Sequence, residues 1–284
     1  MKLDRDWVAR KVFFVAAMMT VLGILLIIAL VTKEAIPAIR KVGPVNLFFS
    51  TDWNPAGGHY GMLVFAVGTV LSTIGALIVG VPLAVGIALF VTEVAPKKAA
   101  ALVTRGVELL AGIPSIVMGW LGFTLLVPWI AKLSHTGGAG LLAAAIVLAI
   151  MIMPTVCAIS IDALDTVPDG YKQSSIGLGA TRWQTIRHVT MPAAKGGILV
   201  GVILGMGRAM GETMAVALVI GPASVFPSSL TTPTHTLTTK ILTEMGEASG
   251  IQRSALFAMA LLLLVIMVAL VMVIRKFAPA KVKA

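Results

Sequence analysis

Long apolar runs alternate with short charged segments along this chain, and the runs set its expected architecture. A helix needs about 20 mostly apolar residues to cross a bilayer. Six runs approach or exceed that length, so we predict six transmembrane helices. Their expected bounds are 12–31, 62–91, 107–130, 141–161, 196–220 and 255–274. Pro82 interrupts the second run, and Pro114 lies near the start of the third.

The composition supports a membrane protein. Hydrophobic residues make up 58% of the 284 positions, charged residues make up only 12%, and the mean hydropathy is +1.00. A soluble domain typically carries about 25% charged residues. We therefore predict an all-α, polytopic membrane protein with a single transmembrane permease domain over 1–284. The single Cys157 excludes an intrachain disulfide, and the scattered histidines predict no metal site.

The charge of the loops predicts the topology. The formal net charge is +10, and in so apolar a chain we interpret it as loop charge that sets orientation rather than as a nucleic-acid site. With a cytoplasmic N-terminus, fifteen of the 22 Lys and Arg residues lie in cytoplasmic segments and six in outer segments. Both termini are therefore expected in the cytoplasm. The first run is longer than the ~7–15 residues of a signal-peptide core, so we expect an uncleaved span.

Two charged residues, Arg208 and Glu212, lie inside the fifth run. A charge in hydrocarbon costs a few kcal/mol or more, so such residues usually face a partner, a cavity or a substrate path. Their i,i+4 spacing puts both on one helix face. That face also carries a Gly-x3-Gly-x3-Gly repeat beginning at Gly197, which predicts contact with protein rather than lipid. Arg208 lies about 20 Å along the helix from Lys195, near mid-membrane.

These residues predict an anion pathway. The forked donors of an arginine suit the oxygens of an oxyanion, so we predict that Arg208 belongs to a gate or anion site and that Glu212 holds it when cargo is absent. A buried salt bridge that only orders helices is the alternative. Thr213 either adds a hydroxyl to this site or bonds a carbonyl of its own helix. Ser115 follows Pro114 and marks either a helix interruption near the pathway or a plain kink.

The longest inner connection, 162–195, contains its own helix signals. In chain order they are a helix start near Pro168, glycines at 177 and 179, a cap at Thr181, a second helix over 182–189 and a stop at Pro192. A segment that merely connects two spans is rarely this long and rarely contains so many helix start and stop signals. We therefore predict a helix–bend–helix element that fits a cleft in a soluble partner.

This segment resembles the EAA loop of ABC importer permeases, whose pattern is E-A-A-x3-G-x9-I-x-L-P. The glycine, the proline and every spacing match, whereas Gln-Ser-Ser replaces the E-A-A triplet. The resemblance implies that 162–195 couples the membrane domain to a separate ATPase. The coupling residues that it implies are Gln173, Ser174, Ser175, Gly179, Ala180, Thr181, Arg182 and Pro192.

Further segments resemble the PstC-type permease subunits of phosphate-specific ABC transporters. The resemblance runs from about residue 50 to 275 and includes the spacing between motifs. The motifs are W-N-P at 53–55, V-P-L-A-V-G-I-A at 81–88, I-P-S-I-V-x-G at 113–119, G-A-T-R-W at 179–183 and G-R-A-M-G-E-T-M-A-V at 207–216. The last motif is the one that points to phosphate.

The resemblance implies a type I ABC importer permease fold in a bacterial or archaeal cytoplasmic (inner) membrane. It also implies three partners: a PstA-type permease subunit, a PstB-type ATPase dimer and a PstS-type phosphate-binding protein. ATP and Mg²⁺ are then expected on the ATPase. The chain contains no G-x4-G-K-[ST] motif, so we predict a subunit that is not an enzyme and binds no cofactor itself.

Three alternatives stay open at this point. Molybdate or sulfate is a possible cargo, because an arginine alone does not choose among tetrahedral anions. A gradient-driven secondary carrier would use the same buried charges, but it has no ATPase for 162–195 to contact. An intramembrane enzyme would need, for example, a Ser–His pair within the spans, and every histidine lies outside them.

Several other features carry no firm assignment. The long outer loops, 33–61 and 222–254, either meet an extracytoplasmic partner or merely connect helices. Glu93 and Glu108 lie near the cytoplasmic surface and are given no special role.

Overall fold

Six helical segments of the protein are long and apolar enough to cross a membrane, which confirms the six-span prediction. The computed structural model describes residues 5–276. The six segments are Ala9–Val42, Leu63–Val94, Ser115–Ser134, Leu141–Asp165, Arg182–Gly211 and Gly250–Lys276. The only strands among the described residues are a short outer hairpin, so the fold is all-α apart from that hairpin.

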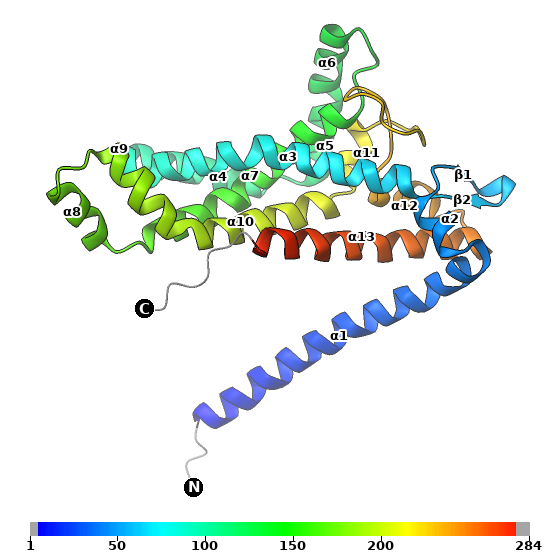
Figure 1. Ribbon diagram of the computed structural model, residues 1–284, viewed down its shortest axis with the longest axis horizontal. Coiled ribbons are helices and arrows are strands. Elements are labelled where there is room, and N and C mark those ends of the chain that lie inside the picture. Colours follow the sequence, from blue (N-terminus) through cyan, green and yellow to red (C-terminus); the bar gives the residue numbers. More distant parts are fainter. Residues whose placement is uncertain (1–4, 277–284) are drawn as a thin grey trace.

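Four long helices run alongside one another and form the body of the molecule (Figure 1). They are α3 (Leu63–Leu89), α7 (Leu141–Asp165), α10 (Met191–Gly211) and α13 (Gly250–Lys276). The first helix, α1 (Arg5–Val42), meets α13 near its own C-terminal end and diverges from the body toward its N-terminal end. The α3 helix continues through Pro82, so the expected interruption there is absent.

Small residues let the central helices approach closely. A Cβ on Gly75 of α3 would lie 2.8 Å from the Cβ of Ala145, and one on Gly80 would lie 2.9 Å from the carbonyl oxygen of Ala149. Both partners belong to α7, which is the most deeply buried span. Dispersion and close packing, rather than a hydrophobic drive between helices, hold apolar spans together in lipid, and glycine makes that packing possible.

The third span differs from the predicted helix over 107–130. The chain instead forms α4 (Lys97–Ala111), breaks at Gly112–Pro114 and restarts as α5 (Ser115–Leu121). A π turn over Gly122–Leu126 then leads into α6 (Val127–Ser134). The break follows from Pro114, which lacks an N–H and keeps the residue before it out of the helical region. Figure 1 shows α6 standing away from the body.

Short elements cover the two ends of the body (Figure 1). One end carries α8 (Asp169–Gly177) and α9 (Arg182–Thr185). The opposite end carries α2 (Pro44–Phe49), the strands β1 (Trp53–Asn54) and β2 (His59–Tyr60), and α12 (Leu237–Glu244). We refer to these as the inner and outer ends, following the predicted topology. The two strands are joined by a turn at Pro55–Gly58.

Candidate translocation pathway and coupling site

The fifth span breaks at the motif that carries the buried charges. The α10 helix ends at Gly211, Glu212 adopts an extended conformation, and α11 (Met214–Val219) begins after Thr213. The prediction of one helix over 196–220 is therefore wrong beyond residue 211. Two local bonds stabilise the break. The backbone N–H of Ala215 donates to the Glu212 carboxylate over 3.2 Å, and the Thr213 hydroxyl donates to the Gly211 carbonyl over 3.2 Å.

Arg208 lies against the middle of α7. Its Nη1 donates to the hydroxyl of Thr155 over 3.4 Å, and its side chain is half-buried. The glycine stripe of α10 faces the same helix, because Cβ atoms on Gly201 and Gly205 would lie 3.2 Å from Ile159 and 2.7 Å from Val156. The predicted contact of this stripe with protein is thus observed, and Arg208 is level with the centre of a spanning helix.

The expected ion pair between Arg208 and Glu212 is not formed. Among the described residues, no carboxylate lies within 4.0 Å of the Arg208 guanidinium. The i,i+4 geometry requires a continuous helix, and the break after Gly211 turns the Glu212 carboxylate toward the start of α11 instead. Within residues 5–276, the Arg208 guanidinium therefore has no carboxylate partner.

The segment after the break at Gly112–Pro114 packs against the segment after the break at Glu212. A Cβ on Gly119 of α5 would lie 2.6 Å from Ala215, and one on Gly122 would lie 2.9 Å from Val219. Ser115 is the first residue of α5, whereas Glu212 and Thr213 lie between α10 and α11. Each of these three predicted site residues therefore lies at a helix break.

The outer loop 222–254 contacts this region directly and is not a plain connection. The Thr238 hydroxyl of α12 donates to the backbone carbonyl of Glu212 over 3.0 Å. The backbone N–H of Leu237 donates to the hydroxyl of Thr69 on α3 over 2.9 Å. The loop therefore joins α3 to the break of the fifth span.

A buried ion pair anchors α12 at the outer end. Lys240 is 6% exposed, and its Nζ lies 2.6 Å from the Glu244 carboxylate and 2.8 Å from the hydroxyl of Ser224. The indole N–H of Trp53 also donates to Glu244, over 3.1 Å, and thereby joins the hairpin to α12. Buried charges need such pairing to offset the cost of leaving water.

His235 is buried beside this pair and stays neutral. Burial, and next the positive charge of Lys240, lower the pKa of His235 to about 4, although Glu244 and a hydrogen bond to the Pro222 backbone act in the opposite direction. Its Nδ1 lies 3.2 Å from the Thr239 hydroxyl.

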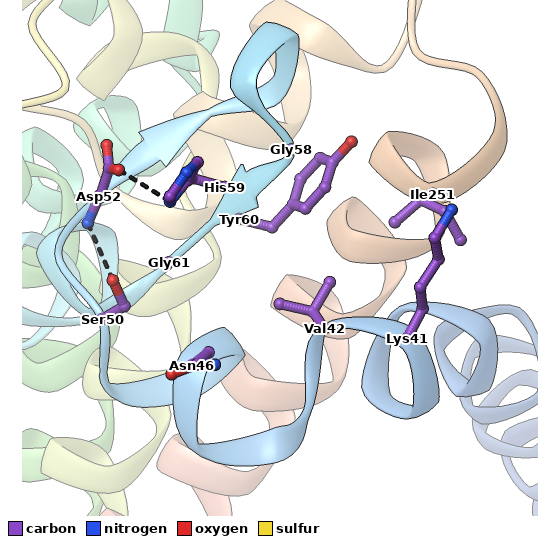
Figure 2. Close-up of a pocket in the computed structure, with 10 residues that line it drawn as sticks. All are labelled: Lys41, Val42, Asn46, Ser50, Asp52, Gly58, His59, Tyr60, Gly61 and Ile251. Carbon is purple, nitrogen blue, oxygen red and sulfur yellow. Dashed lines mark hydrogen bonds and ion pairs between the residues drawn. The ribbon is translucent and has the colours of Figure 1, made fainter.

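An outer cavity of about 500 Å³ lies between the end of α1, the hairpin and the start of α13 (Figure 2). Its lining is polar and apolar in about equal measure. The residues are Lys41, Val42, Asn46, Ser50, Asp52, Gly58, His59, Tyr60, Gly61 and Ile251. Figure 2 shows the Asp52 carboxylate pointing to the His59 ring, and the two groups are 3.1 Å apart.

The inner end carries the predicted helix–bend–helix. The α8 helix ends at Gly177, Gly179 takes a left-handed φ of 87°, and Thr181 caps α9. The Thr181 hydroxyl accepts from the Gln184 backbone over 3.3 Å, and the Gln184 side chain accepts from the Thr181 N–H over 2.8 Å, which completes a capping box. The first helix begins at Asp169, directly after Pro168.

The second inner helix does not stop at Pro192, as the sequence had predicted. The α9 helix passes through a π turn over Ile186–Thr190 into α10, and Pro192 lies in the first turn of α10. A π turn already departs from the i→i−4 hydrogen-bond ladder, so the N–H that proline lacks is not needed there. The inner element is therefore continuous with the span that carries Arg208.

The predicted coupling residues lie on the exposed side of this element. Gln173, Ser174, Gly179, Thr181, Arg182 and Pro192 are exposed, whereas Ser175 and Ala180 are half-buried. Leu178 at the tip of the bend is 90% exposed and Trp183 is 64% exposed. Apolar side chains at the tip of an otherwise polar element indicate a docking surface.

Glu93 is a functional candidate that sequence reasoning missed. Its carboxylate lies 2.7 Å from the Nζ of Lys172 on α8, and both side chains are mostly buried. The one available signal was that Glu93 is the only acidic residue between Asp52 and Glu108. The partner lies 79 positions away in the sequence, so pattern alone does not identify it.

Residues 80–283 match the family described as binding-protein-dependent transport system inner membrane component. The chain belongs to this family. It is a permease subunit of an ABC importer and a multi-pass membrane protein, and its relatives are transporter components rather than enzymes.

Curated relatives confirm the resemblance to PstC-type permeases. The chain is 41% identical over 242 residues to the probable ABC transporter permease protein YqgH of Bacillus subtilis (strain 168), covering 84% of this chain and 78% of the relative. It is 40% identical over 241 residues to the phosphate transport system permease protein PstC of Pasteurella multocida (strain Pm70), covering 78% of this chain and 75% of the relative. The PstC of Xylella fastidiosa (strain 9a5c) is 36% identical over 293 residues, covering 94% and 90%.

Solved structures confirm the type I ABC importer permease fold. A bacterial alginate ABC transporter in complex with its alginate-bound periplasmic protein superposes with a TM-score of 0.66 at 15% identity, covering 96% of both chains. The inward-facing MetNI methionine ABC transporter superposes with a TM-score of 0.55 at 22% identity, covering 76% of this permease and 93% of that chain. At these identities the likeness concerns the fold alone.

Proposed function

We propose that this permease moves inorganic phosphate into the cytoplasm and is driven by a separate ATPase that contacts 162–195. The observation that carries the proposal is the half-buried Arg208 guanidinium, level with the middle of α7 and with no carboxylate partner among residues 5–276. A forked cation in low dielectric favours an oxyanion with several acceptor oxygens.

The surroundings of Arg208 support a pathway rather than a structural pair. Glu212 and Thr213 lie at the break of the fifth span and Ser115 at the break of the third, where backbone groups are released from helical bonding. Irregular backbone at membrane depth is tolerated only inside protein or along a water-filled cavity. We assign Arg208 to anion binding, and Ser115, Glu212 and Thr213 to the polar lining beside it.

The inner surface fits an ATPase partner. The exposed Leu178 and Trp183 offer apolar anchors between exposed polar residues of α8 and α9. We propose that a PstB-type ATPase dimer binds the helix–bend–helix element formed by α8 and α9. The ATPase dimer also binds ATP and Mg²⁺, while this chain binds neither. The loop charges support a cytoplasmic location for this end and for both termini.

Two further partners follow from exposed surfaces. No residue in the apolar window of the first span is buried within this chain, and α1 diverges from the body, so we propose that a PstA-type permease subunit covers part of it. The outer cavity, whose lining includes Lys41, Asn46 and Ser50, and the hairpin beside it suit a PstS-type phosphate-binding protein. A single permease domain over 1–284 in the inner membrane is sufficient for this role.

The test is uptake of labelled phosphate by vesicles that contain the full complex. Arg208→Ala should leave the complex assembled and reduce ATP-driven uptake by about two orders of magnitude, because a buried charge-assisted contact of ~2–3 kcal/mol is lost. The matched control is Arg253→Ala, which removes an exposed arginine at the outer end. Normal uptake by the Arg208→Ala complex would contradict the site assignment.

The same assay separates the alternatives. Excess molybdate or sulfate should leave phosphate uptake unchanged, and strong competition by either anion would assign a different cargo. An uncoupler should have little effect while ATP is present. Uptake that persists without the ATPase and collapses with the uncoupler would instead indicate a gradient-driven carrier.

A further inference from the structure

An ion pair joins the inner helix α8 to the inner end of the second span. The Lys172 Nζ lies 2.7 Å from the Glu93 carboxylate, and the two side chains are 21% and 13% exposed. Glu93 belongs to the π turn Phe90–Val94, which continues α3 at its inner end. The pair therefore joins the predicted ATPase-coupling helix to the second span, although its own chain connects it only to the fourth and fifth.

The chain connection from α8 to the fifth span is poorly suited to transmit movement alone. At its C-terminal end the chain turns at Gly179, where a left-handed φ and open space around the Cα leave the bend without side-chain support. One further contact fixes the two inner helices to each other, since the hydroxyls of Ser175 and Thr185 lie 3.0 Å apart. Thr185 is buried, so this bond lies inside the element rather than at its surface.

The second span connects the Glu93–Lys172 ion pair at the inner end to the helix α12 at the outer end. At its inner end α3 leads to Glu93. Near its outer end, Thr69 of α3 accepts a hydrogen bond from the backbone of Leu237, and the next residue, Thr238, donates to the carbonyl of Glu212. A contiguous set of contacts thus runs from the coupling helix through one rigid helix to the break beside Arg208.

We propose that Glu93 and Lys172 are positioning residues that transmit movement of α8 to α3, and through α3 to the outer helix α12 above the pathway. This inference rests on the proposed ATP-driven function. A half-buried ion pair suits this role because water and salt screen it less than an exposed pair. It therefore resists displacement of α8 relative to the end of α3 more strongly. Coupling of this kind needs a direct test, because contiguous contacts alone do not establish it.

The test uses the whole transporter in vesicles and measures phosphate transported per ATP hydrolysed. The single variants Glu93→Gln and Lys172→Met remove one charge each, and the reversed pair Glu93→Lys/Lys172→Glu restores the attraction. Matched controls are Glu108→Gln and Lys195→Met, which remove exposed charges from the inner half of the chain. Assembly is measured in parallel by co-purification of the ATPase.

We expect each single variant to assemble, to hydrolyse ATP and to transport about fivefold less phosphate per ATP, a typical allosteric coupling factor. The reversed pair should recover most of the loss, because the effect depends on the attraction between the two side chains rather than on either charge alone. A merely structural pair would change assembly but not the phosphate transported per ATP. Unchanged coupling in the single variants, or lost assembly that the reversed pair does not restore, would overturn the inference. If the unsubstituted transporter shows no ATP-driven phosphate uptake, the proposed function itself fails.

Discussion

The Thr238 hydroxyl donates to the backbone carbonyl of Glu212 over 3.0 Å and so ties the outer helix α12 to the point where α10 ends. Thr238 is 9% exposed, and the Glu212 carbonyl has lost its helical partner at the break. This single bond connects the outer loop to the segment beside Arg208. The outer loop therefore belongs to the structure around the break of the fifth span.

Replacing Thr238 by Val should disturb phosphate uptake. The change keeps the shape of the side chain but leaves the Glu212 carbonyl without its donor, at a cost of about 1 kcal/mol in unfolding free energy. Uptake by vesicles and the melting temperature in detergent are the measurements. Thr243→Val is the control, since Thr243 on the same helix is exposed and bonds only its own helix carbonyls. Equal behaviour of the two variants would contradict a special role for Thr238.

Replacing either of two glycines of α10 by alanine should change the stability of the protein, in opposite directions at the two positions. A Cβ on Gly205 would lie 2.7 Å from the Val156 side chain, whereas one on Gly196 meets nothing within 4 Å. Gly205→Ala should destabilise the protein by about 1–3 kcal/mol through overpacking. Gly196→Ala should stabilise it by about 0.5–1 kcal/mol, because alanine is the better helix former. Thermal unfolding checks both, and a stabilising Gly205→Ala would refute the close α7–α10 contact.

Acidification should loosen the outer end through His235. Its folded pKa of about 4 lies below the usual 6.5, so the unfolded chain binds more protons between these values. The stability that neutral His235 contributes is complete above about pH 6.5 and is lost as the pH falls toward 4. The melting temperature should therefore drop less between pH 7.5 and 5 in His235→Asn than in the unsubstituted protein.

The exposed His135 provides the control for this titration. Asparagine tolerates its left-handed backbone conformation, at φ 53°, so His135→Asn should leave the pH dependence unchanged. A His235→Asn variant with the full pH dependence would assign the effect to other groups.

Leu178→Asp should separate the permease from its ATPase without affecting the fold. The side chain is 90% exposed, so a charge there costs this chain little stability, but it would be buried without a partner at an interface. Co-purification of the ATPase is expected to fall at least tenfold, which corresponds to ~1.4 kcal/mol. Leu242→Asp, at an exposed position on the outer helix α12, should leave it intact. Undiminished ATPase binding by Leu178→Asp would place the docking surface elsewhere.

Features that depend on local composition were predictable from the sequence. The apolar runs identified all six spans, because the length of a bilayer-spanning helix is fixed by the membrane. The Thr181 cap and the bend at Gly179 were also predictable, since each depends on neighbouring residues only. The glycine stripe of α10 correctly identified a protein-facing side.

The helix breaks were predicted less well. A helical wheel assumes a continuous helix, so it placed Glu212 beside Arg208, whereas the chain leaves the helix after Gly211 while staying apolar. Hydropathy does not register such a break. Pro192 gave the opposite error, because a π turn allowed the helix to continue past a residue that usually ends one.

Contacts between distant segments were not accessible to pattern reasoning. Glu93 and Lys172 were each unremarkable in their local sequence, and only the tertiary arrangement brings α8 to the inner end of the second span. The same holds for Thr155 and Arg208, which meet because small residues let α7 and α10 approach. Such pairs follow from the tertiary arrangement rather than from any local signal.

The π turn over Ile186–Thr190 lies between the inner helix α9 and the spanning helix α10. A π turn contains one residue more than an α turn. Deleting one residue there would therefore restore an ordinary helix and leave Trp183 and the inner bend in nearly the same orientation, because the wider turn itself accommodates the extra residue. Deleting a residue from the regular part of α10 would instead rotate Trp183 and the inner bend by about 100° around the helix axis and draw them inward by about 1.5 Å. The turn is therefore the part of this segment where a change of length reorients the inner element least.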